Sequence, residues 1–106
     1  MVRWAAGLLS HLAVFHIGEG RPPVVVLQYP GIDTGDFVLA APLYPASAAK
    51  PIEVITPRVN LNGEAFLVGI HLMASIRARA LETQIGSLLD DEYAIQRALS
   101  RLFFGT

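Results

Sequence analysis

The sequence predicts a mostly β domain that ends in one α-helix, and three observations support this fold class. Seven prolines and nine glycines divide the 106 residues into short segments. Several of these segments are rich in β-branched and aromatic residues, as strands are. The segment after Asp91 instead repeats apolar residues every three or four positions, the period of an amphipathic helix. We expect a single domain over residues 1–106, since a chain of this length can bury one core.

Three strands are expected in the first half of the chain. Leu12–Ile17 and Val24–Tyr29 are rich in β-branched and aromatic residues. Residues 18–23 between them contain two glycines and two prolines, which predicts a hairpin with a longer loop. A third strand at Phe37–Tyr44 contains Pro42, which has no backbone N–H, so Pro42 should lie at a sheet edge or a bulge.

A second hairpin is expected in the middle of the chain. Ile52–Arg58 alternates apolar and polar residues, which is typical of a half-buried strand. Asn62-Gly63 favours a tight turn, because both residues adopt positive φ angles readily. Ala65–Leu72 then follows as the partner strand.

Residues Met73–Leu89 are ambiguous on pattern alone. Residues 74–84 have the propensity to form a helix, whereas residues 76–80 alternate as a strand does. The residues themselves leave both interpretations open.

The C-terminal helix is expected to begin at Asp90 or Asp91, either of which can cap it. Arg97 and Arg101 near its end suit the helix dipole. The apolar positions form one stripe, which we expect in the core: Ile95, Ala98, Leu99, Leu102 and Phe103. Phe104 lies off this stripe and Gly105 follows it, so we expect the aromatic end of the helix to be presented to a partner.

Composition excludes several classes of protein. The chain is 53% hydrophobic and 16% charged, which argues against disorder, and its net charge of −1 argues against a stand-alone nucleic-acid binder. It has no cysteine, and its three histidines lack the paired spacing of metal ligands, so no cofactor or metal is expected. Met1–Ser10 is interpreted as an N-terminal extension, because Ser10 and His11 interrupt its apolar run too early for a secretory signal or a membrane span.

One short motif raises an enzymatic alternative. Asp33-Thr34-Gly35 matches the triplet that holds the catalytic aspartate of pepsin-like proteases, whose retroviral forms are β-rich homodimers. However, Pro30-Gly31 breaks the strand that should lead into Asp33, and Asp36 stands where a small residue is expected. A turn is the favoured interpretation, with the protease as a remote alternative. No serine, histidine and aspartate are grouped as in a hydrolase, so no enzymatic activity is expected.

Several segments, in the right order, resemble the CcdB family of plasmid-maintenance toxins. The resemblance runs from about Val24 to the C-terminus, and its most extended part is the terminal helix. The matching segments are Val25–Gln28 with Ile32-Asp33-Thr34, Phe37–Leu43, the turn at Asn62-Gly63-Glu64, Met73-Ala74-Ser75, and Asp91–Gly105.

This resemblance implies both a fold and a function. It implies a small SH3-like antiparallel barrel with a second small sheet, a strand within Met73–Leu89, and a cytoplasmic homodimer. It also implies a protein that binds the A subunit of DNA gyrase and traps the cleaved-DNA state, with no chemistry of its own and no direct contact with nucleic acid or membrane. A cognate antitoxin with a disordered C-terminal tail would remove it. The gyrase contacts would fall on Ile32, Ser100, Phe103, Phe104, Gly105 and Thr106.

The chain departs from the family at the end of the helix. Phe104 stands where the family has tryptophan, and Thr106 stands where it has isoleucine, which weakens stacking and apolar burial. Two further alternatives therefore stay open. One is a related toxin fold with another target, including an RNA-cleaving enzyme, although a pI near 6.3 does not favour a basic groove. The other is a decayed relative that binds an antitoxin but has lost its target.

Overall fold

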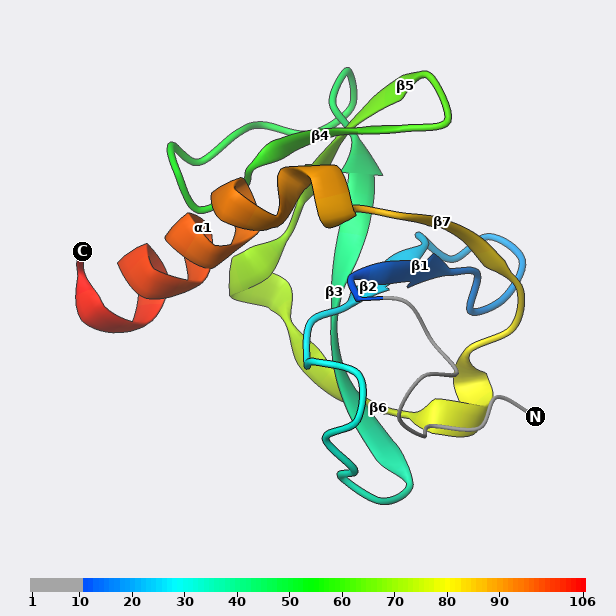
Figure 1. Cartoon of the computed structure of the whole chain (residues 1–106). Helices are drawn as coiled ribbons and strands as arrows, with labels where there is room; N and C mark the ends of the chain where they lie inside the picture. Colours follow the sequence, from blue (N-terminus) through cyan, green and yellow to red (C-terminus); the bar gives the residue numbers. More distant parts are fainter. Residues whose placement is uncertain (1–10) are drawn as a thin grey trace.

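Residues 11–106 form a curled antiparallel sheet with one α-helix packed across it (Figure 1). The computed structural model describes residues 11–106, so the expected N-terminal extension at Met1–Ser10 lies outside the described residues. The mostly β fold class with a C-terminal helix is confirmed. The described residues form β1 (Ala13–Phe15), β2 (Val24–Val26), β3 (Phe37–Pro45), β4 (Arg58–Leu61), β5 (Glu64–Val68), β6 (Ala74–Arg77), β7 (Gln84–Ser87) and α1 (Glu92–Phe104).

Strand β3 organises the sheet because it pairs with three other strands. The strand order is β4-β5-β3-β2-β1-β7, and β6 also pairs with β3. Residues 37–40 of β3 pair with β6, and residues 43–45 pair with β5, which in turn pairs with β4. The second half of β3 thereby starts the second small sheet that was expected, and all these pairings are antiparallel.

Pro42 lies where β3 changes partners, as its missing N–H requires. On one side of β3, Ala40 is the last residue paired with β6 and Leu43 is the first paired with β5. The carbonyl of Pro42 accepts a hydrogen bond from Gly69 N–H at 2.8 Å on this side. Pro42 was expected at a sheet edge or a bulge, but it lies within the central strand β3, opposite Val24 of β2. The sheet accommodates it because no ladder donor is needed from Pro42 at the junction.

The central strands are buried on both faces. All three residues of β1 and of β2 are buried, since successive side chains of a strand point to opposite sides. One core cluster lies between the sheet and α1: Leu12, Val14, Val25, Ala41, Leu43, Val59, Leu61, Val68, Ile70, Leu88, Ile95 and Ala98. The second lies on the opposite face: Ala13, Phe15, Val24, Val26, Val38, Ala40, Ala78 and Leu81.

Both expected hairpins form. β1 pairs with β2 across the glycine- and proline-containing loop. Between β4 and β5, Leu61 pairs with Glu64, so the turn consists of Asn62 and Gly63 alone. These two residues have φ angles of 53° and 86°, the left-handed conformation that a tight hairpin of this kind requires.

The strand expected at Ile52–Arg58 is wrong over most of its length, because β4 begins only at Arg58. The preceding residues form a turn, in which Thr56 N–H donates to the carbonyl of Ile52 at 3.0 Å. The Thr56 hydroxyl adds hydrogen bonds to both backbone groups of Ile52. Val54 in this turn has a φ of 68°. A local side-chain network here replaces the sheet ladder that the alternating pattern predicted.

The partner strand β5 is shorter than expected, and the ambiguous segment Met73–Leu89 forms two short strands. The strand expected at Ala65–Leu72 ends at Val68, and residues 70–72 form the 3₁₀ turn η1 (Ile70–Leu72). Met73–Leu89 contains two strands, β6 and β7, separated by η2 (Ala78–Ala80). The strand interpretation is therefore confirmed, and the helix alternative is wrong. Arg77 ends β6 while Arg79 lies in η2, so these two arginines do not lie on one strand face.

Candidate functional site: the end of the C-terminal helix

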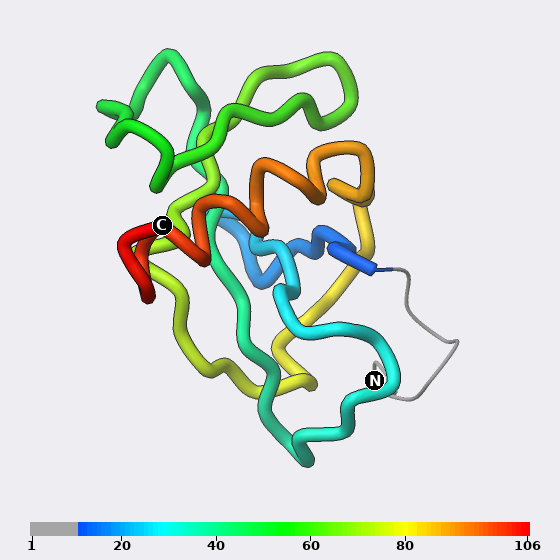
Figure 2. The backbone as a smooth tube through the Cα atoms, turned by 60° about the vertical axis from the view of Figure 1, so that its left-hand side comes forward, coloured from blue at the N-terminus to red at the C-terminus, as the bar shows by residue number. Residues whose placement is uncertain are grey.

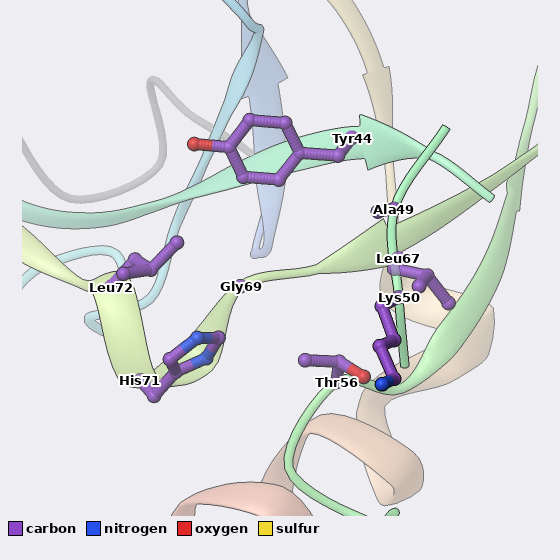
Figure 3. A pocket seen from close by; sticks show the side chains of 8 residues that line it. All are labelled: Tyr44, Ala49, Lys50, Thr56, Leu67, Gly69, His71 and Leu72. Atoms are coloured by element: carbon purple, nitrogen blue, oxygen red, sulfur yellow. The ribbon is translucent and has the colours of Figure 1, made fainter. Parts of the chain in front are cut away.

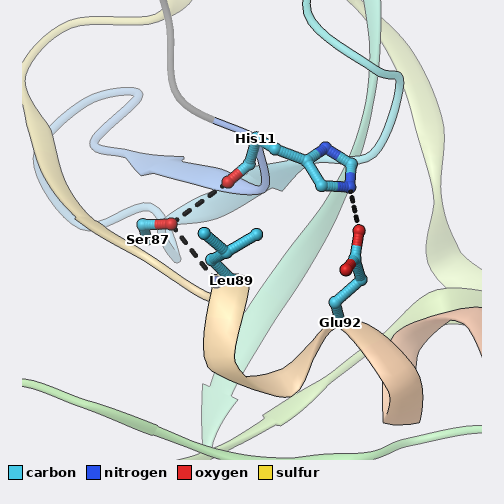
Figure 4. A network of polar contacts seen from close by, with 4 residues as sticks. All are labelled: His11, Ser87, Leu89 and Glu92. Atoms are coloured by element: carbon cyan, nitrogen blue, oxygen red, sulfur yellow. Dashed lines mark hydrogen bonds and ion pairs between the residues drawn. The ribbon is translucent and has the colours of Figure 1, made fainter.

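The start of α1 is attached to the beginning of the sheet (Figure 4). His11 Nε2 lies 2.9 Å from the Glu92 carboxylate at the first residue of the helix. The Ser87 hydroxyl donates to the carbonyl of His11 at 3.1 Å and accepts from the N–H of Leu89 at 3.2 Å. These contacts join residues before β1, at the end of β7 and before α1, so the helix leaves the sheet in a fixed direction.

The helix N-cap is Asp91, although its side chain makes no capping hydrogen bond. Burial raises the pKa of the Asp91 carboxyl, and the neighbouring Asp90 carboxylate raises it further. Asp91 therefore occupies the expected cap position but stabilises the helix less than a hydrogen-bonded cap would.

The apolar stripe of α1 is divided between the core and the surface. Ile95 and Ala98 are buried in the cluster beneath the helix, and Leu99 packs against it. Leu102 is 38% exposed and Phe103 is 62% exposed, so the expectation that they lie in the core is wrong. The last turn of α1 runs past the edge of the sheet, where no strand lies beneath it (Figure 1). Helical periodicity predicts which residues share a face, but not where the surface beneath that face ends.

The end of the helix has a defined backbone conformation. Gly105 adopts a left-handed conformation with φ 75°, and its N–H donates to the carbonyl of Arg101. Arg101 Nη1 donates in turn to the carbonyl of Gly105 at 2.9 Å. The hydroxyl oxygens of Ser100 and Thr106 lie 3.5 Å apart. The last two residues thus fold back onto the final turn of the helix.

This conformation places two adjacent aromatic rings at the surface. Phe103 is 62% exposed and Phe104 is 79% exposed. Exposed aromatic rings of this kind are enriched at protein interfaces, where they provide large apolar area and accept a cation over the ring face. We call residues 100–106 the helix tip.

The structure brings five of the six expected site residues together and places the sixth elsewhere. Ser100, Phe103, Phe104, Gly105 and Thr106 belong to the helix tip. Ile32 is exposed on the loop between β2 and β3. Figures 1 and 2 show this loop and the helix tip apart from each other in two views.

The loop that contains Ile32 is a network of turns, and the protease triplet belongs to it. Asp33 accepts a hydrogen bond from Gly35 N–H at 2.8 Å, and the Thr34 hydroxyl donates to the carbonyl of Phe37 at 2.6 Å. Gln28 Nε2 donates to both the Ile32 carbonyl and the Thr34 hydroxyl. The interpretation of Asp33-Thr34-Gly35 as a turn is confirmed, because the Asp33 carboxylate caps its own backbone.

None of the three histidines lies within a strand. His11 lies in a turn before β1 and His71 lies in η1, whereas exposed His16 follows β1 directly. Among residues 11–106, no three histidine, cysteine, aspartate or glutamate side chains are grouped so that they could hold a metal ion.

A pocket of about 260 Å³ lies between the end of β3 and η1 (Figure 3). Its walls are mainly apolar, and Lys50, the chain's only lysine, is one of the residues that line it. The lining residues are Tyr44, Ala49, Lys50, Thr56, Leu67, Gly69, His71 and Leu72. Ligand pockets usually enclose about 300–1,000 Å³. The pocket is smaller than this range, so the helix tip is the stronger candidate site.

The sequence analysis did not predict the hydrogen bond from the Arg101 side chain to the Gly105 carbonyl. Its position near the helix end suggested only a favourable interaction with the dipole. The spacing of four residues between Arg101 and Gly105 was the available signal, because side chains in a helix reach groups one turn away. The pocket residues had no recognisable spacing, since they come from three separated segments of the chain.

These features describe a small β-rich protein that exposes an aromatic helix end as an interaction surface. Residues 14–105 match the family described as CcdB protein, and since this match covers nearly the whole chain, the chain belongs to the CcdB family. The family comprises toxins of toxin–antitoxin systems that target DNA gyrase without enzymatic activity. The search of curated proteins gives no match to this chain. Within residues 11–106, none of the helices has the length and apolar character needed to cross a membrane.

Proposed function

We propose that this chain is a toxin that binds the A subunit of DNA gyrase through the helix tip and traps the complex in which DNA is cleaved. The observation that supports this most is the exposed pair Phe103 and Phe104 on a helix end that extends past the sheet. The family targets gyrase, and the tip provides an exposed aromatic surface for such a target.

The tip suits a partner that presents a cation to an aromatic ring. Phe104 is exposed over most of its surface, so a gyrase arginine can lie over its face. Such a contact stabilises a complex by about 0.5–2 kcal/mol, less for phenylalanine than for tryptophan. The polar Thr106 adds little apolar burial. We therefore expect gyrase binding to be weaker than a tryptophan–isoleucine tip would provide.

We also propose that the protein is a homodimer. Phe37 and Leu39 lie on the same face of β3 as Ala41 and Leu43, because alternate residues of a strand share a face. Ala41 and Leu43 are buried in the core cluster that contains residues of α1, whereas Phe37 and Leu39 are exposed. The Arg77 guanidinium lies over the Phe37 ring, 5.1 Å from its centroid, but both apolar side chains stay partly exposed. This half of the face is therefore a suitable surface for a second copy. Leu39→Arg should then convert a dimer into a folded monomer in sedimentation experiments, and an unchanged sedimentation coefficient would exclude this surface.

We further propose that a cognate antitoxin with a disordered C-terminal tail removes this protein from gyrase. Such a tail can cover a large area while it orders on binding. Addition of the antitoxin to a preformed toxin–gyrase complex should restore supercoiling.

Growth arrest tests the proposed function in cells. Induced expression of the chain should stop growth, and removal of residues 104–106 should abolish the arrest while the sheet and dimer stay intact. Tyr93→Ala is a matched control, because Tyr93 is also 79% exposed but lies at the opposite end of α1. Retained toxicity after removal of the tip would exclude the tip as the toxic element. It would favour another target, including RNA cleavage. Absence of any arrest would favour a decayed relative.

A further inference from the structure

Arg101 contacts Gly105 through both its backbone and its side chain. The Arg101 carbonyl accepts the hydrogen bond from Gly105 N–H at 3.0 Å, and Arg101 Nη1 donates to the Gly105 carbonyl at 2.9 Å. Both peptide groups of Gly105 are thereby held by one residue on the last turn of the helix. The backbone contact is an ordinary helix end, but the side-chain contact depends on the identity of residue 101.

We propose that Arg101 is a positioning residue that fixes the conformation of Gly105 and Thr106 and thereby the presentation of Phe104 to its partner. The ordering of the tip is independent of the target, whereas its consequence for gyrase rests on the proposed function. Arg101 acts here through Gly105, and no contact between its side chain and the target is required.

The physical reason is the cost of ordering a chain end. Terminal residues gain few contacts and fray unless they are held. Glycine loses more conformational freedom than any other residue when its backbone is fixed. If the guanidinium fixes Gly105 before binding, a partner does not have to order it. A surface that is ordered in advance binds more tightly than the same surface that must first be ordered.

Arg97 provides a comparison within the same helix. It lies one turn before Arg101 and is also exposed. Within the described part of the chain, its side chain makes no hydrogen bond or ion pair with the helix tip. Arg97→Leu therefore removes the same charge as Arg101→Leu without removing a contact to Gly105. Leucine and arginine have similar helix propensities, so both variants should retain the helix.

The first experiment measures order at the tip and does not use gyrase. Heteronuclear ¹⁵N NOE values of Gly105 and Thr106 should be close to those of the helix in the wild type and in Arg97→Leu. They should fall in Arg101→Leu, and Arg101→Lys should restore them in part, because an ammonium can donate to the same carbonyl. Equal NOE values in Arg101→Leu and the wild type would overturn the proposal, since the tip would then be ordered without the guanidinium.

The second experiment measures binding of each variant to the gyrase A subunit. Arg101→Leu should bind about five- to thirtyfold more weakly, from the cost of ordering about one residue, whereas Arg97→Leu should bind as the wild type does. Equal binding by Arg101→Leu and the wild type would overturn the consequence for presentation. Weaker binding with an unchanged tip NOE would mean that Arg101 contacts the target directly, which also contradicts a positioning role. If wild type does not bind gyrase at all, the proposed function fails while the NOE result still decides the role of Arg101 in ordering the tip.

Discussion

His11 and Glu92 are 81 positions apart in the sequence, yet His11 Nε2 lies 2.9 Å from the Glu92 carboxylate. The His11 ring also lies against the ring of Tyr29, with centroids 5.0 Å apart. One side chain therefore connects the segment before β1, the loop after β2 and the first residue of α1. Figure 4 shows its contact with Glu92. Since α1 presents the helix tip at its other end, this contact helps to set where the tip lies.

We expect His11→Ala to lower the free energy of unfolding by about 1–2 kcal/mol, because it removes both the hydrogen bond and the ring contact. Glu92→Gln should cost less than about 1 kcal/mol, since the glutamine carbonyl can still accept a hydrogen bond and Glu92 is partly exposed. Urea denaturation measures both values, with exposed Glu19→Gln as the control. A larger cost for Glu92→Gln than for His11→Ala would contradict this assignment.

Asp91 should make stability depend on pH in a specific direction. Its pKa in the folded protein is raised above the usual 3.8, by burial first and by Asp90 second. The window runs from the usual pKa of 3.8, which applies to the unfolded chain, up to the higher pKa of the folded protein. Within it the folded state binds more protons than the unfolded state, so stability falls as the pH rises. We expect Asp91→Asn to be more stable than the wild type at pH 7, with the difference vanishing below pH 3.8.

Carboxyl NMR titration tests the two causes of this shift separately. Asp90→Asn should lower the pKa of Asp91 only in part, because burial is the larger cause. A return of the Asp91 pKa to its usual value in Asp90→Asn would show that the order of the two causes is wrong.

Because only part of the apolar stripe of α1 is buried, truncating a buried and an exposed side chain of the stripe should lower stability by different amounts. Ile95 is 1% exposed within the core cluster, so Ile95→Ala should cost about 2–5 kcal/mol of stability. Leu102 is 38% exposed, and Leu102→Ala should cost less than about 1 kcal/mol. Chemical denaturation of both variants, at a protein concentration that keeps the oligomeric state constant, measures the difference. Equal costs would mean that the end of the stripe is also part of the core.

The sequence predicted those elements whose conformation is determined by residues within the element itself. Asn62-Gly63 predicted its hairpin because two positive φ angles are required there. The helix was predicted from its period. In each case the determining residues lie within the element itself.

Features that depend on a specific side-chain contact, or on where distant parts of the chain lie, were not predicted. Ile52–Arg58 has the alternation of a strand, but the Thr56 hydroxyl bonds to Ile52 and forms a turn instead. The exposure of Leu102 and Phe103 depends on where the sheet ends beneath α1. At the candidate site, sequence alone singled out Phe104 and Gly105, whereas the second contact of Arg101 required the folded helix end.

The most direct test of the central proposal is a DNA cleavage assay with purified gyrase. The wild-type protein should inhibit supercoiling and cause linear DNA to accumulate, and Phe104→Ala should abolish this accumulation. Tyr93→Ala, which truncates an equally exposed aromatic side chain on the same helix, should leave it unchanged. Linear DNA that accumulates equally with Phe104→Ala, or no linear DNA with wild type at large excess over gyrase, would contradict the proposal that the helix tip of this chain poisons gyrase.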